Sequence, residues 1–278
     1  STGKEGKGIL PVVGESPARP EDYDDDRIFV ALGVDDRTMS FLEKLAAEGH
    51  PVFRMGLNGA GDLGEQFFLW EMATAAAGHV LAINPFDQPN VESAKIQTKE
   101  AVALFKKTGK LPGDAPLCSE GSLTFYGNVI GAEPKEIIGA LLKKATAGSY
   151  VALQAYLNPA DSIDDALSVL RNGLRDRLRK AVTLGYGPRF LHSTGQLHKG
   201  DGGKGLFIQI TADDREDRPI PDEPGSQASS LSFGVLKAAQ AMGDCRALVA
   251  GGRTVVRVHI SGDTEEGLEA LGKIVLSV

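Results

Sequence analysis

The chain has 278 residues, of which 42% are hydrophobic and 24% charged, values typical of a globular protein with one large domain or two small ones. A formal net charge of −7 and a sequence pI near 5.3 argue against nucleic acid or an anionic membrane as the main partner. No apolar run approaches the roughly 20 residues that a membrane helix needs, and the two cysteines predict free thiols in a reducing, cytoplasmic compartment.

Residues 1–26 are rich in Gly, Pro and acidic residues and predict an irregular segment. After them the hydrophobic pattern alternates between short apolar runs and longer amphipathic stretches. In the first half, strands are predicted at 28–32, 52–55 and 80–83, and helices at 38–48, 63–77 and 90–107.

The second half follows the same alternation. Its predicted strands are 150–157, 189–192, 205–211 and 255–260, and its predicted helices are 137–145, 163–184, 233–242 and 265–276. Regular exchange of strands and helices predicts an α/β fold with three layers, in which mostly parallel sheets carry helices on both faces.

A weak internal repeat supports two related lobes. Residues 1–8 align with residues 193–200, and five of the eight positions are identical. We therefore divide the chain into residues 1–112 and residues 113–278, each expected to form one α/β lobe.

One polar cluster stands out in the first lobe, at residues 84–95. It follows the apolar run 78–83, and Asn90 suits the N-cap of the next helix, so the cluster lies where open α/β sheets bind ligands. Lys95 falls near the start of that helix, where the helix dipole disfavours a cation. The alternative is an ordinary turn and helix with a Glu92–Lys95 pair.

A second candidate is His192, at the end of a predicted strand and before small polar residues. Imidazole titrates near neutral pH, which suits acid–base catalysis, although a lone histidine is more often structural. The Gly-rich stretch 199–205 offers backbone amides for a phosphate, but a loop beside an active site is the favoured interpretation.

Three segments resemble the phosphoglucose isomerase family. Residues 86–95, Phe-Asp-Gln-Pro-Asn-Val-Glu-Ser-Ala-Lys, match the signature F-D-Q-x-G-V-E-x-x-K except that Asn90 replaces Gly. The opening Ser-Thr-Gly-Lys is similar to the E-S-x-G-K segment, beginning one residue after its catalytic glutamate, and residues 191–196 are similar to the L-H-S-x-G-Q segment. Residues 185–200 and 151–157 further resemble the C-terminal part of bacterial transaldolase/phosphoglucose isomerase fusion proteins.

The resemblance implies isomerisation of glucose 6-phosphate and fructose 6-phosphate through ring opening and a cis-enediolate, without a metal or other cofactor. Lys95 and His192 would open the ring, Gln88 would position the sugar and Glu92 would order the site. The other residues expected near the substrate are Ser1, Thr2, Gly3, Lys4, Ser193, Thr194 and Gln196.

The order of the segments leaves two alternatives open. In ordinary members of the family the histidine segment precedes the F-D-Q segment, whereas here it follows. Either the segments are rearranged or the histidine segment is a paralogous copy.

The expected partners are a hexose 6-phosphate, the N-terminal isomerase lobe and transaldolase domain of the fusion, and a second copy in a homodimer. With the glutamate and phosphate lobe absent, we expect this chain alone to have little or no isomerase activity. The alternatives are a non-catalytic sugar-phosphate-binding module and a scaffold lobe that docks transaldolase through the arginine-rich residues 171–179.

Overall fold

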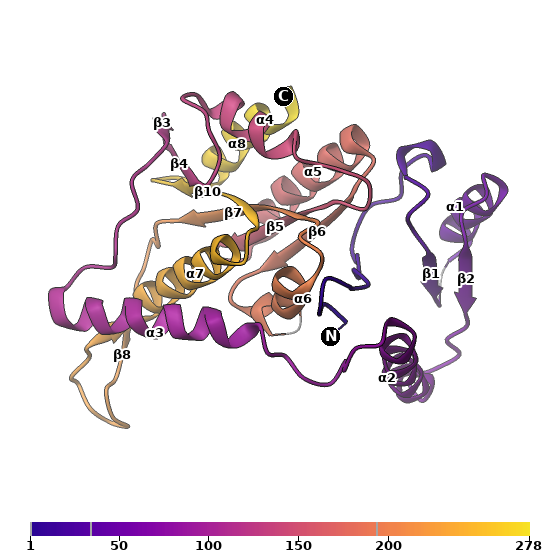
Figure 1. The fold of residues 1–278 in the computed structure, drawn as a ribbon, viewed down its shortest axis with the longest axis horizontal. Helices are drawn as coiled ribbons and strands as arrows, with labels where there is room; N and C mark the ends of the chain where they lie inside the picture. Colours follow the sequence, from indigo (N-terminus) through magenta and orange to yellow (C-terminus); the bar gives the residue numbers. More distant parts are fainter. Residues whose placement is uncertain (1, 34, 193) are drawn as a thin grey trace.

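The fold is built around a six-stranded sheet in the order β3-β4-β10-β7-β5-β6 (Figure 1). The computed structural model describes residues 2–33, 35–192 and 194–278. Strands β10, β7, β5 and β6 are mutually parallel, and β4 is antiparallel to β10 and β3. The strands are β3 (Cys118–Glu120), β4 (Leu123–Gly127), β5 (Tyr150–Tyr156), β6 (Ala181–Tyr186), β7 (Gly205–Ala212) and β10 (Thr254–Ile260).

Helices cover both faces of this sheet, which confirms the predicted α/β class. On one face α4 (Pro134–Leu142), α5 (Asp161–Leu178) and α8 (Thr264–Ser277) enclose the main hydrophobic core. On the other lie α6 (Thr194–Gly200) and α7 (Phe233–Ala250), with α3 (Val91–Thr108) packed along α7 (Figure 1). A short hairpin, β8 (Pro219–Ile220) with β9 (Leu231–Ser232), precedes α7.

The alternation of side chains along each strand explains the two layers. In β10, Val256, Val258 and Ile260 are wholly buried in the core shared with α4 and α8. Their neighbours Arg257 and His259 project to the opposite face, where α7 lies.

The first part of the chain forms a smaller unit. Strands β1 (Phe29–Leu32) and β2 (Val52–Met55) pair in parallel, and α1 (Asp36–Ala47) packs on them through Leu42 and Leu45. The 3-10 helix η1 (Pro20–Asp22) precedes β1. The proposed division at residue 112 stays a prediction, and α3 packs on α7, which belongs to the far side of that division.

The strand predicted at 80–83 is wrong, because helix α2 (Asp62–Leu81) extends into it and residues 82–83 form a turn. The stretch before it, Ala-Thr-Ala-Ala-Ala-Gly, favours helix over strand, and a short apolar run alone does not distinguish the two. Ala82 ends the helix at φ 53°, and the Ile83 N–H donates to the Gly78 carbonyl oxygen at 2.9 Å. The F-D-Q segment therefore follows a helix.

The long helix predicted at 163–184 is also divided. Helix α5 ends at Leu178, Arg179 takes a left-handed φ of 54°, and β6 begins at Ala181. The strand predicted at 189–192 is instead the 3-10 helix η2 (Arg189–Leu191). Val182 and Thr183 are β-branched, and they pair with β5 in the sheet. The helix-like spacing of apolar residues in 163–184 does not predict this pairing.

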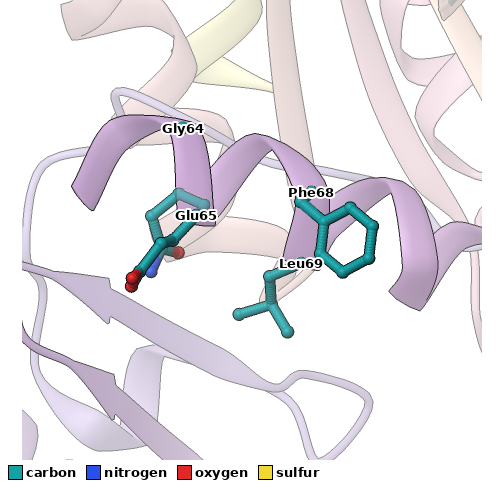
Figure 2. Close-up of a pocket in the computed structure, with 5 residues that line it drawn as sticks. Gly64, Glu65, Phe68 and Leu69 are labelled. Atoms are coloured by element: carbon teal, nitrogen blue, oxygen red, sulfur yellow. The ribbon is translucent and has the colours of Figure 1, made fainter. Parts of the chain in front are cut away.

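Helix α2 leaves large apolar side chains in solvent. Phe67 and Phe68 are 63% and 67% exposed, and Leu69, Trp70 and Met72 are also exposed. A hollow of about 560 Å³ is lined by residues that all belong to this one helix, and Figure 2 draws their side chains along it. The hollow is therefore a flank of α2 and not an enclosed site. Over the described residues, no helix has the length and apolar character needed to span a membrane.

Candidate functional site

Three segments from distant parts of the sequence meet at the side chain of Gln196. This residue is wholly buried at the start of α6. Its Nε2 donates to the Gly3 carbonyl oxygen at 2.8 Å and to Asn90 Oδ1 at 2.7 Å. Its Oε1 accepts from the Asn90 backbone N–H at 2.8 Å. One amide thus joins the opening segment, the F-D-Q segment and the L-H-S segment.

Asn90 occupies the N-cap position of α3, as the sequence predicts. Its side chain does not cap the helix, because its oxygen accepts from Gln196 instead. The first turn of α3 is therefore fixed by contact with α6 and not by its own cap.

Lys4 ties the opening segment to the F-D-Q segment a second time. Its ammonium binds the Asn84 carbonyl oxygen and the Asp87 carboxylate, and its side chain is only 6% exposed. Nearby, Lys7 Nζ donates to the Leu81 carbonyl oxygen at 2.6 Å. In this structure Lys4 joins two segments of the chain, and Thr2 Oγ1 accepts from the Ile9 N–H at 2.9 Å.

Glycines permit the close approach of these segments. A Cβ at Gly3 would lie 2.2 Å from Leu197 Cα, and one at Gly200 would lie 2.0 Å from the Gly3 carbonyl oxygen. Gly6 N–H donates to the Gly200 carbonyl oxygen at 3.1 Å. The two stretches that align as an internal repeat therefore lie directly against each other.

Lys95 lies on the exposed side of α3. Its Nζ is 3.2 Å from Glu92 Oε2, and the two side chains are 61% and 58% exposed. Such a surface pair contributes about 0–1 kcal/mol, so the ammonium can exchange this partner for a ligand. Gln88 is exposed as well.

His192 lies between η2 and α6 and is exposed, while Thr194 is half-buried at the first position of α6. Helices α3 and α6 are in contact, which brings the two motif-bearing elements together. No hydrogen bond or ion pair joins Lys95 to His192 within the described ranges. The predicted site residues Ser1 and Ser193 lie outside those ranges.

Two residues of α6, His198 and Lys199, take part in a buried polar network that the sequence analysis did not predict. Lys199 forms an ion pair with Asp244 of α7, and both side chains are almost fully buried. His198 Nδ1 lies 3.3 Å from Gln154 Nε2 of β5, and Gln209 Nε2 donates to the Ala241 carbonyl oxygen at 3.1 Å. The network connects the central sheet to two helices: α6, which contains part of the L-H-S segment, and α7.

Burial sets the protonation behaviour of this network. Desolvation, with the nearby Lys199 charge, lowers the pKa of His198 to about 3, so its imidazole is neutral at physiological pH. Desolvation also raises the pKa of Asp244, an effect opposed by Lys199 and Gln154. In the sequence, this network is indicated only by Gln154 and Gln209, two polar residues within mostly apolar strands. They predict a buried polar contact but do not identify its partner.

The Gly-rich stretch 199–205 is held by Arg253. Its Nη2 donates to the carbonyl oxygens of Lys199 and Asp201, both at 2.7 Å, and Asp201 Oδ1 accepts from the Gly203 N–H. Among the described residues, no group of three or more His, Cys, Asp or Glu side chains could hold a metal ion.

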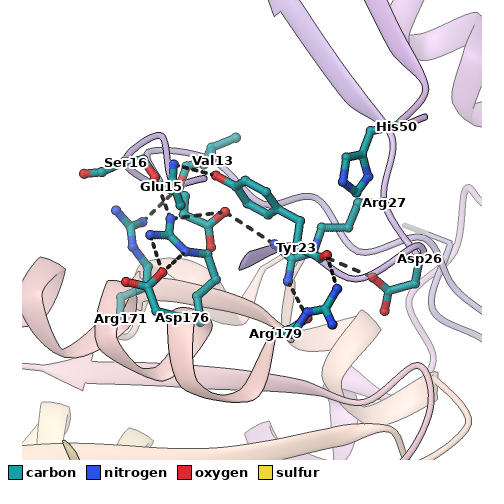
Figure 3. A network of polar contacts seen from close by, with 12 residues as sticks. Val13, Glu15, Ser16, Tyr23, Asp26, Arg27, His50, Arg171, Asp176 and Arg179 are labelled. Atoms are coloured by element: carbon teal, nitrogen blue, oxygen red, sulfur yellow. Dashed lines mark hydrogen bonds and ion pairs between the residues drawn. The ribbon is translucent and has the colours of Figure 1, made fainter. Parts of the chain in front are cut away.

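The arginine-rich face of α5 is occupied by the chain's own N-terminal segment (Figure 3). Arg171 and Arg175 are 4% and 3% exposed. Arg171 Nη1 donates to the Val13 carbonyl oxygen at 3.1 Å, and Arg179 Nη2 donates to the Tyr23 carbonyl oxygen at 3.0 Å. Arg171 and Arg175, which belong to the face suggested for docking transaldolase, are therefore engaged in a contact within this chain.

Glu15 lies at the centre of this contact. Its Oε2 is 3.7 Å from Arg27 Nη1 and 3.9 Å from Arg175 Nη1. Burial raises the pKa of Glu15, and the two arginines oppose that rise. The guanidinium groups of Arg27 and Arg175 also lie over the Tyr23 ring, at 5.0 and 5.5 Å from its centroid. This network fixes the path of the chain between the opening segment and β1.

Comparison with models of known protein families finds no match, and neither does comparison with curated protein sequences. Among solved structures, the chain is similar to a hypothetical protein, TT0462 from Thermus thermophilus, with 15% identity and a TM-score of 0.41. The alignment covers 92% of this chain and 66% of that protein, so the chain spans slightly less than two thirds of its length.

Proposed function

We propose that this chain is part of an aldose–ketose isomerase that acts on a hexose 6-phosphate, with Lys95 and His192 opening the sugar ring. The observation that carries the proposal is the meeting of the three motif-bearing segments at Gln196. Segments that contribute to one active site have to converge in space, and these three do so although 106 residues separate Gln196 from Asn90.

In the proposed reaction an ammonium and an imidazole move a proton between the ring oxygen and the C1 hydroxyl. Lys95 suits this role because its exposed ion pair with Glu92 is exchangeable. His192 suits it because its ring is exposed at the entrance to α6. A glutamate, which the isomerase resemblance places next to the opening segment, would move the proton between C2 and C1.

Binding and turnover test the proposal separately. We expect fructose 6-phosphate to bind in titration calorimetry, and Lys95→Met and His192→Gln each to weaken binding by about fivefold or more, as for loss of one hydrogen bond to a charged group. Lys99→Met on the same helix and His79→Gln on α2 are matched exposed controls. In a coupled assay this chain alone is expected to turn over little or no substrate.

Three results would count against the isomerase. Absence of hexose 6-phosphate binding both by this chain and by a longer protein that contains it would overturn the proposal. Binding that neither Lys95→Met nor His192→Gln weakens would place the ligand elsewhere. Binding without turnover in any longer protein that contains this chain would favour a sugar-phosphate-binding regulatory module instead.

The proposal includes a second copy of the chain that covers α2. The accessible surface is 14,855 Å², whereas a compact monomer of 29.4 kDa exposes about 11,500 Å². The difference exceeds the roughly 800 Å² per partner of a standard interface. We expect a dimer in light scattering, and Phe68→Glu, at an exposed apolar position of α2, to yield monomers. A wild-type monomer at all concentrations would contradict this.

A further inference from the structure

A cavity of about 270 Å³ opens at the carboxyl ends of β5 and β7, beside β10. None of its lining residues belongs to the three motif segments. Its walls include Tyr156, Thr211, His259, Arg257, Lys237 and Asp214. In α/β sheets this edge is where ligands bind, because loops and helix ends leave a crevice there.

The strand register concentrates polar side chains at this edge. Tyr156, Thr211 and His259 are paired neighbours on three adjacent strands, so all three project to the same face of the sheet. Arg257 lies on that face too, two residues before His259 in β10. Towards the amino ends, the same face is apolar and packs under α7 through Ala152, Phe207 and Val255.

Each cation of the cavity already has a carboxylate partner. Lys237 pairs with Asp214, and Arg257 Nη2 lies 3.1 Å from Asp114 Oδ2. A multiply charged anion or cation would have to displace one of these partners. A neutral ligand with hydroxyl groups can hydrogen-bond to both signs of charge without breaking either pair.

Two hydrogen-bond donors in the wall remain without a partner among the described residues. Tyr156 is wholly buried, and its hydroxyl makes no hydrogen bond to any of them. The same holds for Nε of Arg257, whose guanidinium carbon Cζ lies 4.3 Å from the centroid of the Tyr126 ring. Burial keeps the pKa of Tyr156 well above its usual value, so its phenol stays a donor. Buried donors of this kind favour a ligand with acceptor oxygens.

We propose that this cavity binds a neutral polyhydroxylated molecule of about monosaccharide size. The cavity is near the lower limit of roughly 300 Å³ for small-molecule sites, which excludes nucleotides and larger cofactors. The proposal is independent of the isomerase, because it uses neither the motif residues nor a phosphate group.

Ligand-observed NMR and calorimetry with glucose, fructose and sorbitol test the site, with inorganic phosphate and glucose 6-phosphate as charged comparisons. At least one neutral polyol should bind in the millimolar range, and inorganic phosphate should not. Tyr156→Phe and Lys237→Met should each weaken binding about five- to tenfold. Tyr150→Phe, on the same strand and face but outside the cavity lining, is the matched control and should leave binding unchanged.

The outcomes are separable from those of the isomerase. Failure of all three polyols to bind overturns the proposal, and so does binding that only phosphorylated ligands show. If Gln196→Leu abolishes polyol binding while Tyr156→Phe and Lys237→Met keep it, the ligand binds at the motif segments instead. If Tyr156→Phe lowers the melting temperature severely, the half-buried Lys237 variant decides the question.

Discussion

The side chain of Gln196 pairs with Asn90 through both ends of its amide. Its Oε1 accepts from the Asn90 N–H at 2.8 Å, and its Nε2 donates to Asn90 Oδ1 at 2.7 Å. The same Nε2 also holds the Gly3 carbonyl oxygen. Because Gln196 is wholly buried, water cannot replace these bonds if the amide is removed.

Replacing this amide tests how far the arrangement of the three segments depends on it. Gln196→Leu leaves the Gly3 carbonyl oxygen and the Asn90 N–H without their partner, and should lower the free energy of unfolding by about 2–3 kcal/mol. Urea denaturation measures the change. Gln227→Leu, at an exposed position, should stay within about 0.5 kcal/mol of wild type. Equal effects of the two substitutions would show that the amide does not hold the segments.

Gly3 and Gly272 should respond in opposite directions to alanine. At Gly3 the new Cβ meets backbone, 2.2 Å from Leu197 Cα, so Gly3→Ala should cost about 1–3 kcal/mol and speed amide exchange in residues 2–8. Gly272 lies within α8 with nothing inside 4 Å of the added Cβ. There alanine should stabilise by about 0.5–1 kcal/mol. Unchanged exchange in residues 2–8 after Gly3→Ala would refute the close approach.

The Lys199–Asp244 pair should behave as a buried ion pair. Lys199→Met leaves the Asp244 carboxylate buried without its cation and should cost about 3–5 kcal/mol. Adding Asp244→Leu removes the stranded charge, so the double variant should be more stable than Lys199→Met alone. A double-mutant cycle by chemical denaturation measures this. Additive losses would mean that the two side chains do not interact.

Acid should destabilise the protein through His198. Its pKa falls from an ordinary value of 6.5 to about 3 on folding, so the unfolded chain binds this proton first. The stability that neutral His198 provides is complete above pH 6.5, and it is lost as the pH falls towards 3 at up to about 1.4 kcal/mol per pH unit. The raised pKa of Asp244 acts in the opposite direction, since it favours the folded state as pH falls.

The difference between wild type and His198→Gln isolates the histidine from Asp244. Unfolding free energies between pH 7 and pH 4 should show a shallower acid loss in the variant. His79→Gln on the exposed face of α2 should keep the wild-type slope. Parallel curves for all three proteins would rule out a buried, neutral His198.

The strands of the central sheet illustrate what sequence patterns predict well. The sequence predicts strands at residues 150–157 and 255–260, and these residues form β5 (Tyr150–Tyr156) and β10 (Thr254–Ile260). Both are short, largely apolar runs bounded by Gly or polar turns, with two tyrosines in β5 and several β-branched residues in β10. The prediction for 80–83 is wrong because the Ala-rich residues before it favour a helix at least as strongly as Val80 and Ile83 favour a strand.

The sequence by itself determined the α/β class, because the periodicity of strands and helices is a local property of the chain. The resemblance of three segments to known motifs also made them candidates for one site. Only the tertiary structure decided that Gln196 meets Asn90 and Gly3, and that Tyr156, Thr211 and His259 form one row. These contacts depend on strand register and helix packing, and both depend on how side chains from the whole chain are buried in the core. No local stretch of sequence contains that information.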